Sequence, residues 1–311
     1  MSGLCDGRVV IVTGAGGGIG REYALAFARE GAKVVVNDLG GSRDGSGGSA
    51  TLAQAVVDEI VAAGGEAVAN GDSVASWAGA KNMVEQAVDT FGRLDVLVNN
   101  AGILRDKMLV NMSEEDWDSV INVHLKGTFA PTRQAAEYWR GAAKAGQAVD
   151  GRVINTTSPS GLYGSVGQAN YGSAKAGIAG FTIIAARELG RYGVTVNAIA
   201  PTALTRMTED IPFMQQLAGP DESGFDATSP ANIAPIAVWL GSGRSREVTE
   251  RVFAVWGGRI TVLEGWVAGP SVDRHGPWQA SELDDVLPDL VAKAAPNADG
   301  MGVRSSTAGI A

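Results

Sequence analysis

Short β-branched runs alternate with segments of helical periodicity along most of this chain, and this alternation restricts the fold more than any other feature. Residues 8–13 and 33–37 are apolar runs of the kind expected of strands buried on both faces. Between them, residues 18–29 carry apolar side chains at helical spacing, and Gly31 is a suitable C-cap. This strand–helix–strand order predicts a parallel sheet with helices on both faces.

The same alternation continues beyond the second strand. We expect further helices at 51–63, 75–91, 117–143 and 169–192, and further strands at 66–70, 94–98, 152–157, 194–199 and 252–255. Residues 39–49 are rich in Gly and Ser and are expected to form a flexible excursion. The pattern weakens after Gly257, and residues 294–311 are expected to be a loosely held tail. We therefore predict a single α/β domain, a doubly wound parallel sheet of Rossmann type in residues 1–258, with a C-terminal extension at 259–311.

Charge and composition exclude several classes of protein. A net charge of −9 disfavours nucleic acid and anionic membrane surfaces as partners, because long-range steering would be repulsive. No apolar run approaches the roughly 18 residues of a membrane-spanning helix, and residues 1–14 lack the pattern of a signal peptide. The lone Cys5 can form no internal disulfide. We expect a cytoplasmic protein with a small-molecule substrate and no metal centre.

A glycine-rich turn, TGAGGGIG at residues 13–20, joins the first predicted strand to the first helix. A dinucleotide pyrophosphate at this turn would meet exposed N–H groups and the positive end of the helix dipole. Such a turn alone is weak evidence, because any tight turn can use glycines. Asp38, however, stands at the end of the second strand about 20 residues on, where a carboxylate can accept hydrogen bonds from ribose hydroxyls. Together the two features predict dinucleotide binding.

Asp38 also bears on the choice between NAD and NADP. Its carboxylate would repel the 2′-phosphate of NADP, which favours NAD. Arg43, in the glycine-rich excursion, is the opposing feature because it could pair with that phosphate. A loop arginine is more often solvated, so NAD is the predicted cofactor.

Three side chains form a candidate catalytic set. Tyr171 and Lys175 lie four residues apart on a predicted helix, hence on one face, and Ser158 follows a buried strand. A nearby ammonium and a cationic nicotinamide would both lower the pKa of the phenol from its ordinary value near 10. We predict that Tyr171 exchanges a proton with the substrate oxygen, Ser158 holds that oxygen, and Lys175 reaches the nicotinamide ribose. The alternative is a surface tyrosine beside a solvated lysine.

With these motifs, residues 6–258 resemble a classical short-chain dehydrogenase/reductase. In that family Asp72 reaches adenine, residues 100–102 lie beside the cofactor after the fourth strand, and Pro201 and Thr205 meet the nicotinamide amide. The residue after the proline is usually glycine, whereas here it is Thr202. The resemblance implies cofactor contacts from Gly14, Gly18, Ile19, Gly20, Asp38, Asp72, Ser73, Asn100, Ala101, Gly102, Tyr171, Lys175, Pro201 and Thr205.

The fourth catalytic residue of that family is an asparagine, and the frame Val-His-Leu-Lys-Gly places His124 at its position. Asn122 lies two residues too early. The family uses the main-chain carbonyl of this residue to hold a relay water and its side chain to lock a helix kink. Two roles for His124 stay open: a structural histidine that fills the kink, and a residue that titrates in the proton path.

Within the family, the chain resembles the (3R)-hydroxyacyl-CoA dehydrogenase part of peroxisomal multifunctional enzyme type 2 and actinobacterial relatives. The resemblance implies a 3-hydroxyacyl-CoA substrate from fatty-acid or steroid side-chain breakdown, with a separate hydratase. A dehydrogenase of free steroids or other secondary alcohols, an NADPH-dependent 3-oxoacyl reductase, and a dinucleotide-binding scaffold without turnover are the alternatives. The shared segments are residues 37–41, 101–106, 167–171 and 206–208, together with His124.

The region after the sixth predicted strand, residues 201–230, is irregular and lies where such sheets bind substrate. Its large apolar residues are candidates for a lid over the substrate, with ordinary core packing as the alternative. They are Met207, Phe213, Met214 and Phe225.

Two features point to subunit association. The predicted helices at 117–143 and 169–192 are apolar on more than one face, so one face of each needs a cover beyond the sheet. Trp256, Trp266 and Trp278 are expected to cover a subunit interface or the sheet end. We predict a two-fold homodimer or a homotetramer built from it.

Overall fold

The computed structural model describes residues 3–47, 51–210 and 212–304, which fall into two units, Met1–Leu263 and Glu264–Ala311. The first unit holds an eight-stranded sheet in the order β3-β2-β1-β4-β5-β6-β7-β8. Only the β7–β8 pair is antiparallel. The strands are β1 (Val9–Thr13), β2 (Lys33–Asn37), β3 (Glu66–Asn70), β4 (Val96–Asn99), β5 (Gly151–Thr156), β6 (Val194–Thr202), β7 (Val252–Trp256) and β8 (Arg259–Leu263).

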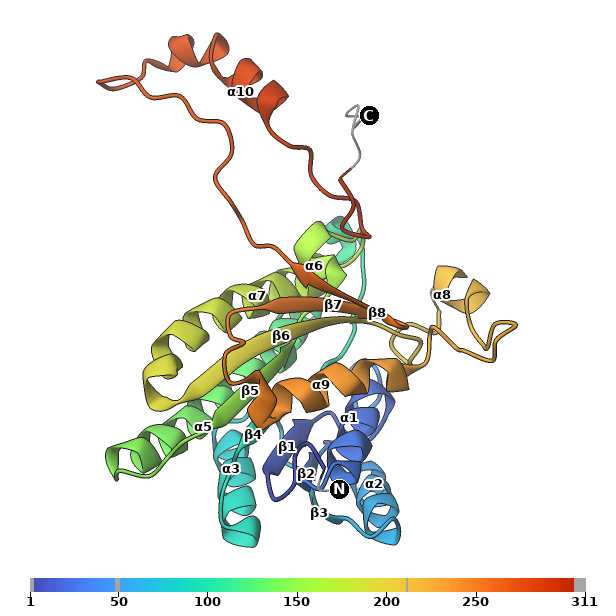
Figure 1. Cartoon of the computed structure of the whole chain (residues 1–311). Helices are drawn as coiled ribbons and strands as arrows, with labels where there is room; N and C mark the ends of the chain where they lie inside the picture. The colour runs from blue at the N-terminus through green and yellow to red at the C-terminus, as the bar shows by residue number, and fades with distance from the viewer. Residues whose placement is uncertain (1–2, 48–50, 211, 305–311) are drawn as a thin grey trace. The chain divides into compact units, whose positions relative to one another are not determined.

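Helices cover both faces of this sheet, which confirms the predicted doubly wound α/β fold (Figure 1). On one face lie α1 (Gly18–Arg29), α2 (Thr51–Ala62) and α9 (Ala234–Gly241). The other face is covered by α3 (Trp77–Phe91), α5 (Gly127–Lys144) and α7 (Ala169–Leu189). Each layer buries its own apolar cluster, because side chains of a parallel strand alternate between two covered faces.

The strand order reverses between β1 and β4, where Val10 pairs with Val34 on one side and with Val96 on the other. The crossover connections leave β1 and β4 in opposite directions at this point. A crevice therefore opens beyond the carboxyl ends of these strands, and this is where open α/β sheets bind their ligands.

One expected helix is interrupted. Residues 117–143 were predicted as one helix, but the structure has α4 (Glu114–Ile121), a π-helical turn η2 (Asn122–Lys126) and then α5. The N–H of Gly127 donates to the carbonyl of Asn122, five residues earlier. Such a turn holds one extra residue, which hydrophobic periodicity does not detect. The π turn changes the direction of the helix at the position of His124.

Several elements were not predicted, among them α9 and β8. Helix α9 is apolar almost throughout and six of its eight residues are buried, so it has no clear amphipathic period. Strand β8 follows a two-residue turn at Gly257–Gly258 and extends the sheet five residues beyond the boundary expected at residue 258. The remaining short elements of this unit are η1 (Leu109–Asn111), α6 (Pro159–Tyr163), η3 (Gly190–Tyr192), α8 (Pro212–Gln216), η4 (Pro230–Ile233) and η5 (Gly243–Ser245).

The second unit contains η6 (Ala280–Asp284) and α10 (Leu287–Lys293). None of its described residues is buried, and Trp266 is fully exposed. The guanidinium of Arg274 lies 5.1 Å from the ring centroid of Trp278. Part of the expected loose tail, residues 305–311, lies outside the described residues. Across the described ranges, no helix has the length and apolar character needed to cross a bilayer.

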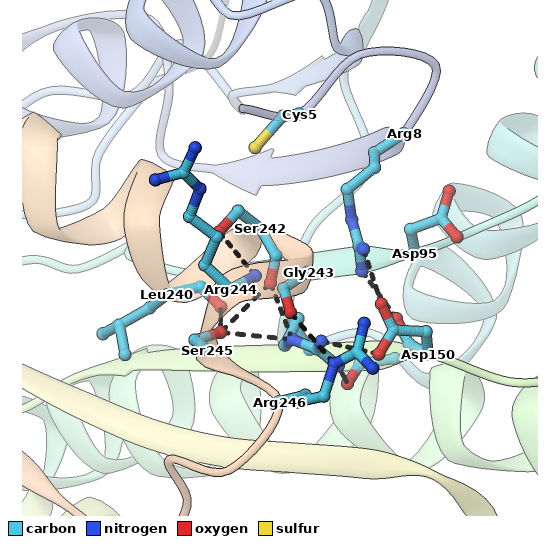
Figure 2. Close-up of polar contacts among 12 residues, drawn as sticks. Cys5, Arg8, Asp95, Asp150, Leu240, Ser242, Gly243, Arg244, Ser245 and Arg246 are labelled. Atoms are coloured by element: carbon cyan, nitrogen blue, oxygen red, sulfur yellow. Dashed lines mark hydrogen bonds and ion pairs between the residues drawn. The ribbon is translucent and has the colours of Figure 1, made fainter. Parts of the chain in front are cut away.

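A buried arginine holds the amino end of β5 through polar contacts. Figure 2 shows residues around it, among them Arg8, Asp150 and Ser242. Arg152 is 1% exposed, and its guanidinium donates to Asp150 at 2.6 Å and to the carbonyl of Ser242 at 3.2 Å. Arg8 donates to the same carboxylate at 2.8 Å. Burial alone would raise the pKa of Asp150, but the hydrogen bonds from Arg8 and Arg152 hold it below its usual range. This ion cluster lies at the edge of the sheet opposite the crevice.

Candidate active site

A cavity of about 620 Å³ opens at the carboxyl edge of the sheet, within the size range of cofactor and substrate sites. Every site residue expected from the sequence lines it, although the residues come from eight separate stretches of the chain. They are Gly14, Gly18, Ile19, Gly20, Asp38, Asp72, Ser73, Asn100, Ala101, Gly102, His124, Ser158, Tyr171, Lys175, Pro201 and Thr205.

The glycine-rich turn is held against the end of β4. Gly14 has a φ of +64°, and a Cβ there would lie 2.7 Å from the Cα of Ala101, so only glycine fits. The side-chain amide of Asn100 donates to the carbonyls of Thr13 at 3.0 Å and Gly14 at 3.2 Å. The hydroxyl of Thr13 accepts from the N–H of Asn100 at 2.9 Å. These contacts fix the turn before any ligand arrives.

Asp38 braces the same turn from the end of β2. Its carboxylate accepts from the N–H of Gly16 at 2.8 Å and from the N–H of Gly40 at 2.7 Å. A carboxylate has about four acceptor positions, so it keeps capacity for a ribose hydroxyl. Asp72 accepts from Asn70 at 3.0 Å at the end of β3.

The excursion after β2 is tied down in its described part, residues 39–47; residues 48–49 lie outside the description. The carbonyl of Arg43 accepts from the N–H of Leu104 at 3.0 Å. The guanidinium of Arg43 forms an ion pair with Asp210, in the region after β6. Arg43 is therefore occupied by a carboxylate of this chain.

Tyr171 and Lys175 project from the first turns of α7 toward the cavity. The Lys175 ammonium donates to the carbonyl of Thr156 at 2.6 Å and lies 5.5 Å from the centroid of the Tyr171 ring. Ser158 caps α6, where its hydroxyl accepts from the N–H of Ser160 at 3.2 Å. The Ser158 hydroxyl also hydrogen-bonds with the Tyr171 hydroxyl, so both lie where they could share a substrate oxygen.

The pKa values of this set differ from the sequence-based expectation. Burial raises the pKa of Tyr171 to about 12, and the Ser158 hydroxyl only partly opposes this rise. Burial also lowers the pKa of Lys175 to about 7. We expected the ammonium to lower the pKa of the phenol, but desolvation outweighs it in the protein alone. A cationic group beside the phenol would be needed to favour phenolate near neutral pH.

His124 lies in the π turn and is 1% exposed. Its Nε2 is 2.7 Å from the carbonyl oxygen and 3.1 Å from the amide nitrogen of Ile103. The ring meets the Tyr171 ring edge to face, with centroids 5.1 Å apart. A Cβ at Gly102 would lie 2.3 Å from Cε1 of His124, so glycine makes room for the imidazole. Burial lowers the pKa of His124 to about 3, which keeps the ring neutral at physiological pH.

Of the lid candidates, Met207 and Met214 line the cavity. Phe225 is 43% exposed and is not among the lining residues, so it is not part of the wall. The side chain of Phe213 lies outside the description. The apolar wall also includes Leu104 and Val166. We did not predict these two residues from the sequence, although each lies in a loop that follows a predicted strand.

The residues present fit a nicotinamide dinucleotide. Gly17, the N-cap of α1, supplies no side-chain hydrogen bond, so the first N–H groups of the helix are open to an anion. Asp38 and Asp72 stand at the ends of neighbouring strands, where ribose and adenine would lie. When bound, the cofactor supplies the hydride acceptor or donor. Across the described part of the chain, no cluster of three or more metal-ligating side chains occurs.

Comparisons with known proteins agree with this site. A family model described as short chain dehydrogenase matches residues 8–215. The hydroxyacyl-CoA dehydrogenase ChsB1 of Mycobacterium tuberculosis is 46% identical over 304 residues, covering 94% of this chain and 90% of that protein. Peroxisomal multifunctional enzyme type 2 of Drosophila melanogaster is 52% identical over 235 residues, covering 76% of this chain and 36% of that protein. A short chain dehydrogenase structure from Mycobacterium avium is 58% identical, with a TM-score of 0.84 over 96% of this chain and 99% of that one. This chain therefore belongs to the short-chain dehydrogenase family of oxidoreductases.

Proposed function

We propose that this protein is an NAD-dependent dehydrogenase of 3-hydroxyacyl-CoA thioesters. The observation that carries the proposal is the convergence of Ser158, Tyr171 and Lys175 on one cavity with the glycine-rich turn. The substrate class is supported by the name of the relative from Mycobacterium tuberculosis, which matches nearly the whole chain. An apolar wall that includes Met207 and Met214 suits an acyl group.

Each catalytic side chain has a defined task in this proposal. The hydroxyl of Ser158 donates a hydrogen bond to the substrate oxygen and holds it beside Tyr171. The phenol of Tyr171 gives a proton to that oxygen in reduction and takes one in oxidation. Lys175, fixed by the carbonyl of Thr156, supplies positive charge behind the phenol and reaches the nicotinamide ribose. His124 is neutral, and we propose that it is structural: it fills the π turn and supports the Tyr171 ring from the side.

NAD is the proposed cofactor rather than NADP. The carboxylate of Asp38 lies against the glycine-rich turn, where it would accept from the ribose hydroxyls and repel a 2′-phosphate. Arg43, the residue that could have favoured NADP, is paired with Asp210.

The test is a reduction assay with acetoacetyl-CoA and NADH, followed by the absorbance of reduced nicotinamide. We expect turnover that is faster with NADH than with NADPH at equal concentration. Tyr171→Phe should remove turnover and change NADH affinity only a few-fold, because the ring still packs but the exchangeable proton is gone. Turnover of a free 3-ketosteroid but not of the thioester would instead support the alternative of a steroid dehydrogenase. A Tyr171→Phe variant within about tenfold of the parent would refute the catalytic assignment.

We also propose that the protein is a homodimer or a tetramer built from dimers. An apolar surface lies across α3, α5 and α7, where Phe129 is 44% and Ile184 58% exposed. The ring of Phe129 packs against Trp77 and Phe181, with centroids 6.0 and 6.2 Å apart. Exposed aromatic clusters of this kind are typical of contact surfaces.

A cytoplasmic location is likewise a proposal. It is supported by the single cysteine, Cys5, which is a buried free thiol and hydrogen-bonds to the carbonyl of Val238 at 3.6 Å.

A further inference from the structure

The cavity has three cationic side chains in its wall, and one of them has no partner among the described residues. Lys175 donates to the carbonyl of Thr156, and Arg43 is paired with Asp210. Arg206 is exposed to solvent and lines the cavity, yet it forms no ion pair or hydrogen bond with any other described residue. Its guanidinium is therefore free to bind an anionic ligand in the cavity.

Arg206 lies directly over the glycine-rich turn. Its Nη2 is 3.6 Å from the point where a Cβ would stand at Gly17, and the methyl group of its neighbour Thr205 is 3.5 Å from the same point at Gly18. Gly17 and Gly18 begin α1, whose first N–H groups and dipole attract an anion. The guanidinium and the helix terminus therefore face the same volume from two sides.

From this geometry we infer that Arg206 binds the pyrophosphate of the dinucleotide, clamping it against the first turn of α1. The inference rests on the proposed function only in taking a nicotinamide dinucleotide as the ligand. Guanidinium pairs with phosphate oxygens through two parallel hydrogen bonds and carries a full positive charge, which backbone N–H groups do not. Arg206 belongs to the region after β6, not to the glycine-rich turn near the start of the chain.

The clamp also connects the cofactor to the substrate wall. The hydroxyl of Thr208 donates to the carbonyl of Ala203 at 2.7 Å and accepts from the N–H of Thr205 at 2.9 Å. The N–H of Met207 donates to the Thr205 hydroxyl at 3.2 Å. These bonds make residues 203–208 one compact turn, so Arg206 and Met207 move together. Pairing of Arg206 with pyrophosphate would thus help to set the position of Met207 in the cavity.

The test measures affinity without turnover. Dissociation constants for NADH, NADPH, ADP-ribose and CoA are measured by fluorescence and titration calorimetry for the parent, Arg206→Ala and Arg206→Lys. Loss of the guanidinium should weaken both NADH and ADP-ribose by about 10- to 100-fold, with a smaller loss in the lysine variant. Arg251→Ala is the matched control, because it removes the same charge from an exposed position outside the cavity wall. Its affinities should stay within about twofold of the parent.

Three outcomes would overturn the inference. ADP-ribose affinity in Arg206→Ala could stay equal to that of the parent, the loss could be confined to CoA, or it could be confined to NADPH. The second outcome would assign Arg206 to the pyrophosphate of the thioester, and the third to a 2′-phosphate. Unchanged thermal unfolding of the ligand-free variants checks that they are folded. Because ADP-ribose lacks the nicotinamide, its binding is measured without any turnover. This result is therefore independent of whether 3-hydroxyacyl-CoA proves to be the substrate.

Discussion

The buried imidazole of His124 should make the folded protein sensitive to acid. The folded ring has a pKa of about 3, against 6.5 for an ordinary histidine. Its neutral form therefore contributes full stability above pH 6.5, and this contribution is lost as the pH falls from 6.5 toward 3. From these values, lowering the pH from about 7.5 to about 5 should cost about 2 kcal/mol through this one residue.

The assay is urea unfolding at several pH values and one fixed protomer concentration, comparing the parent with His124→Asn. The variant loses packing against Tyr171 and is less stable at every pH. Its stability should nevertheless fall by about 2 kcal/mol less than that of the parent between the two pH values. Lys175 is present in both proteins, so its titration largely cancels in the difference. Parallel pH curves for the two proteins would refute a neutral, desolvated His124.

Three further outcomes are expected. Asp38→Ala should weaken NAD binding and raise turnover with NADP relative to NAD, measured as a ratio of kcat/KM; an unchanged ratio would contradict the role of this carboxylate. Asp150→Ala should lower the free energy of unfolding by about 2 kcal/mol, because the buried guanidinium of Arg152 loses its counter-charge. Arg152→Met removes the buried charge itself and should lower the free energy of unfolding by less. Urea unfolding that gave the reverse order would disprove this account. Light scattering at micromolar concentration should give a multiple of 31.9 kDa, and a monomer mass would exclude the proposed interface.

The sequence predicted most of the sheet because parallel strands buried on both faces are continuous β-branched runs, which have few other interpretations. It also brought most candidate site residues to one edge of the sheet, since most of the motifs follow a strand and the carboxyl ends of parallel strands share one edge. The π turn at residues 122–126 was not predictable in the same way, because one inserted residue does not alter the apolar content of a helix. Helix α9 lacked a clear period because six of its eight residues are buried.

Strand β8 did carry a signal that was overlooked. Gly257 and Gly258 separate two runs with β-branched residues, and two glycines at such a place are a strong hairpin marker. Arg206 could not have been assigned from the sequence, because its proximity to Gly17 depends on how the region after β6 crosses the cavity. The pKa of Tyr171 in the protein alone is raised by burial. A sequence shows which charged residues are present, but it does not show how far a side chain is desolvated.

The contact between His124 and Gly102 restricts which substitutions these two positions can accept during evolution. Any side chain at position 102 would overlap the imidazole, with its Cβ 2.3 Å from Cε1. A side chain at position 102 is therefore tolerated only after His124 has been replaced by a smaller residue, and the two substitutions can occur in that order only. The two positions, 22 residues apart, should therefore vary as a pair, with histidine found only where position 102 is glycine.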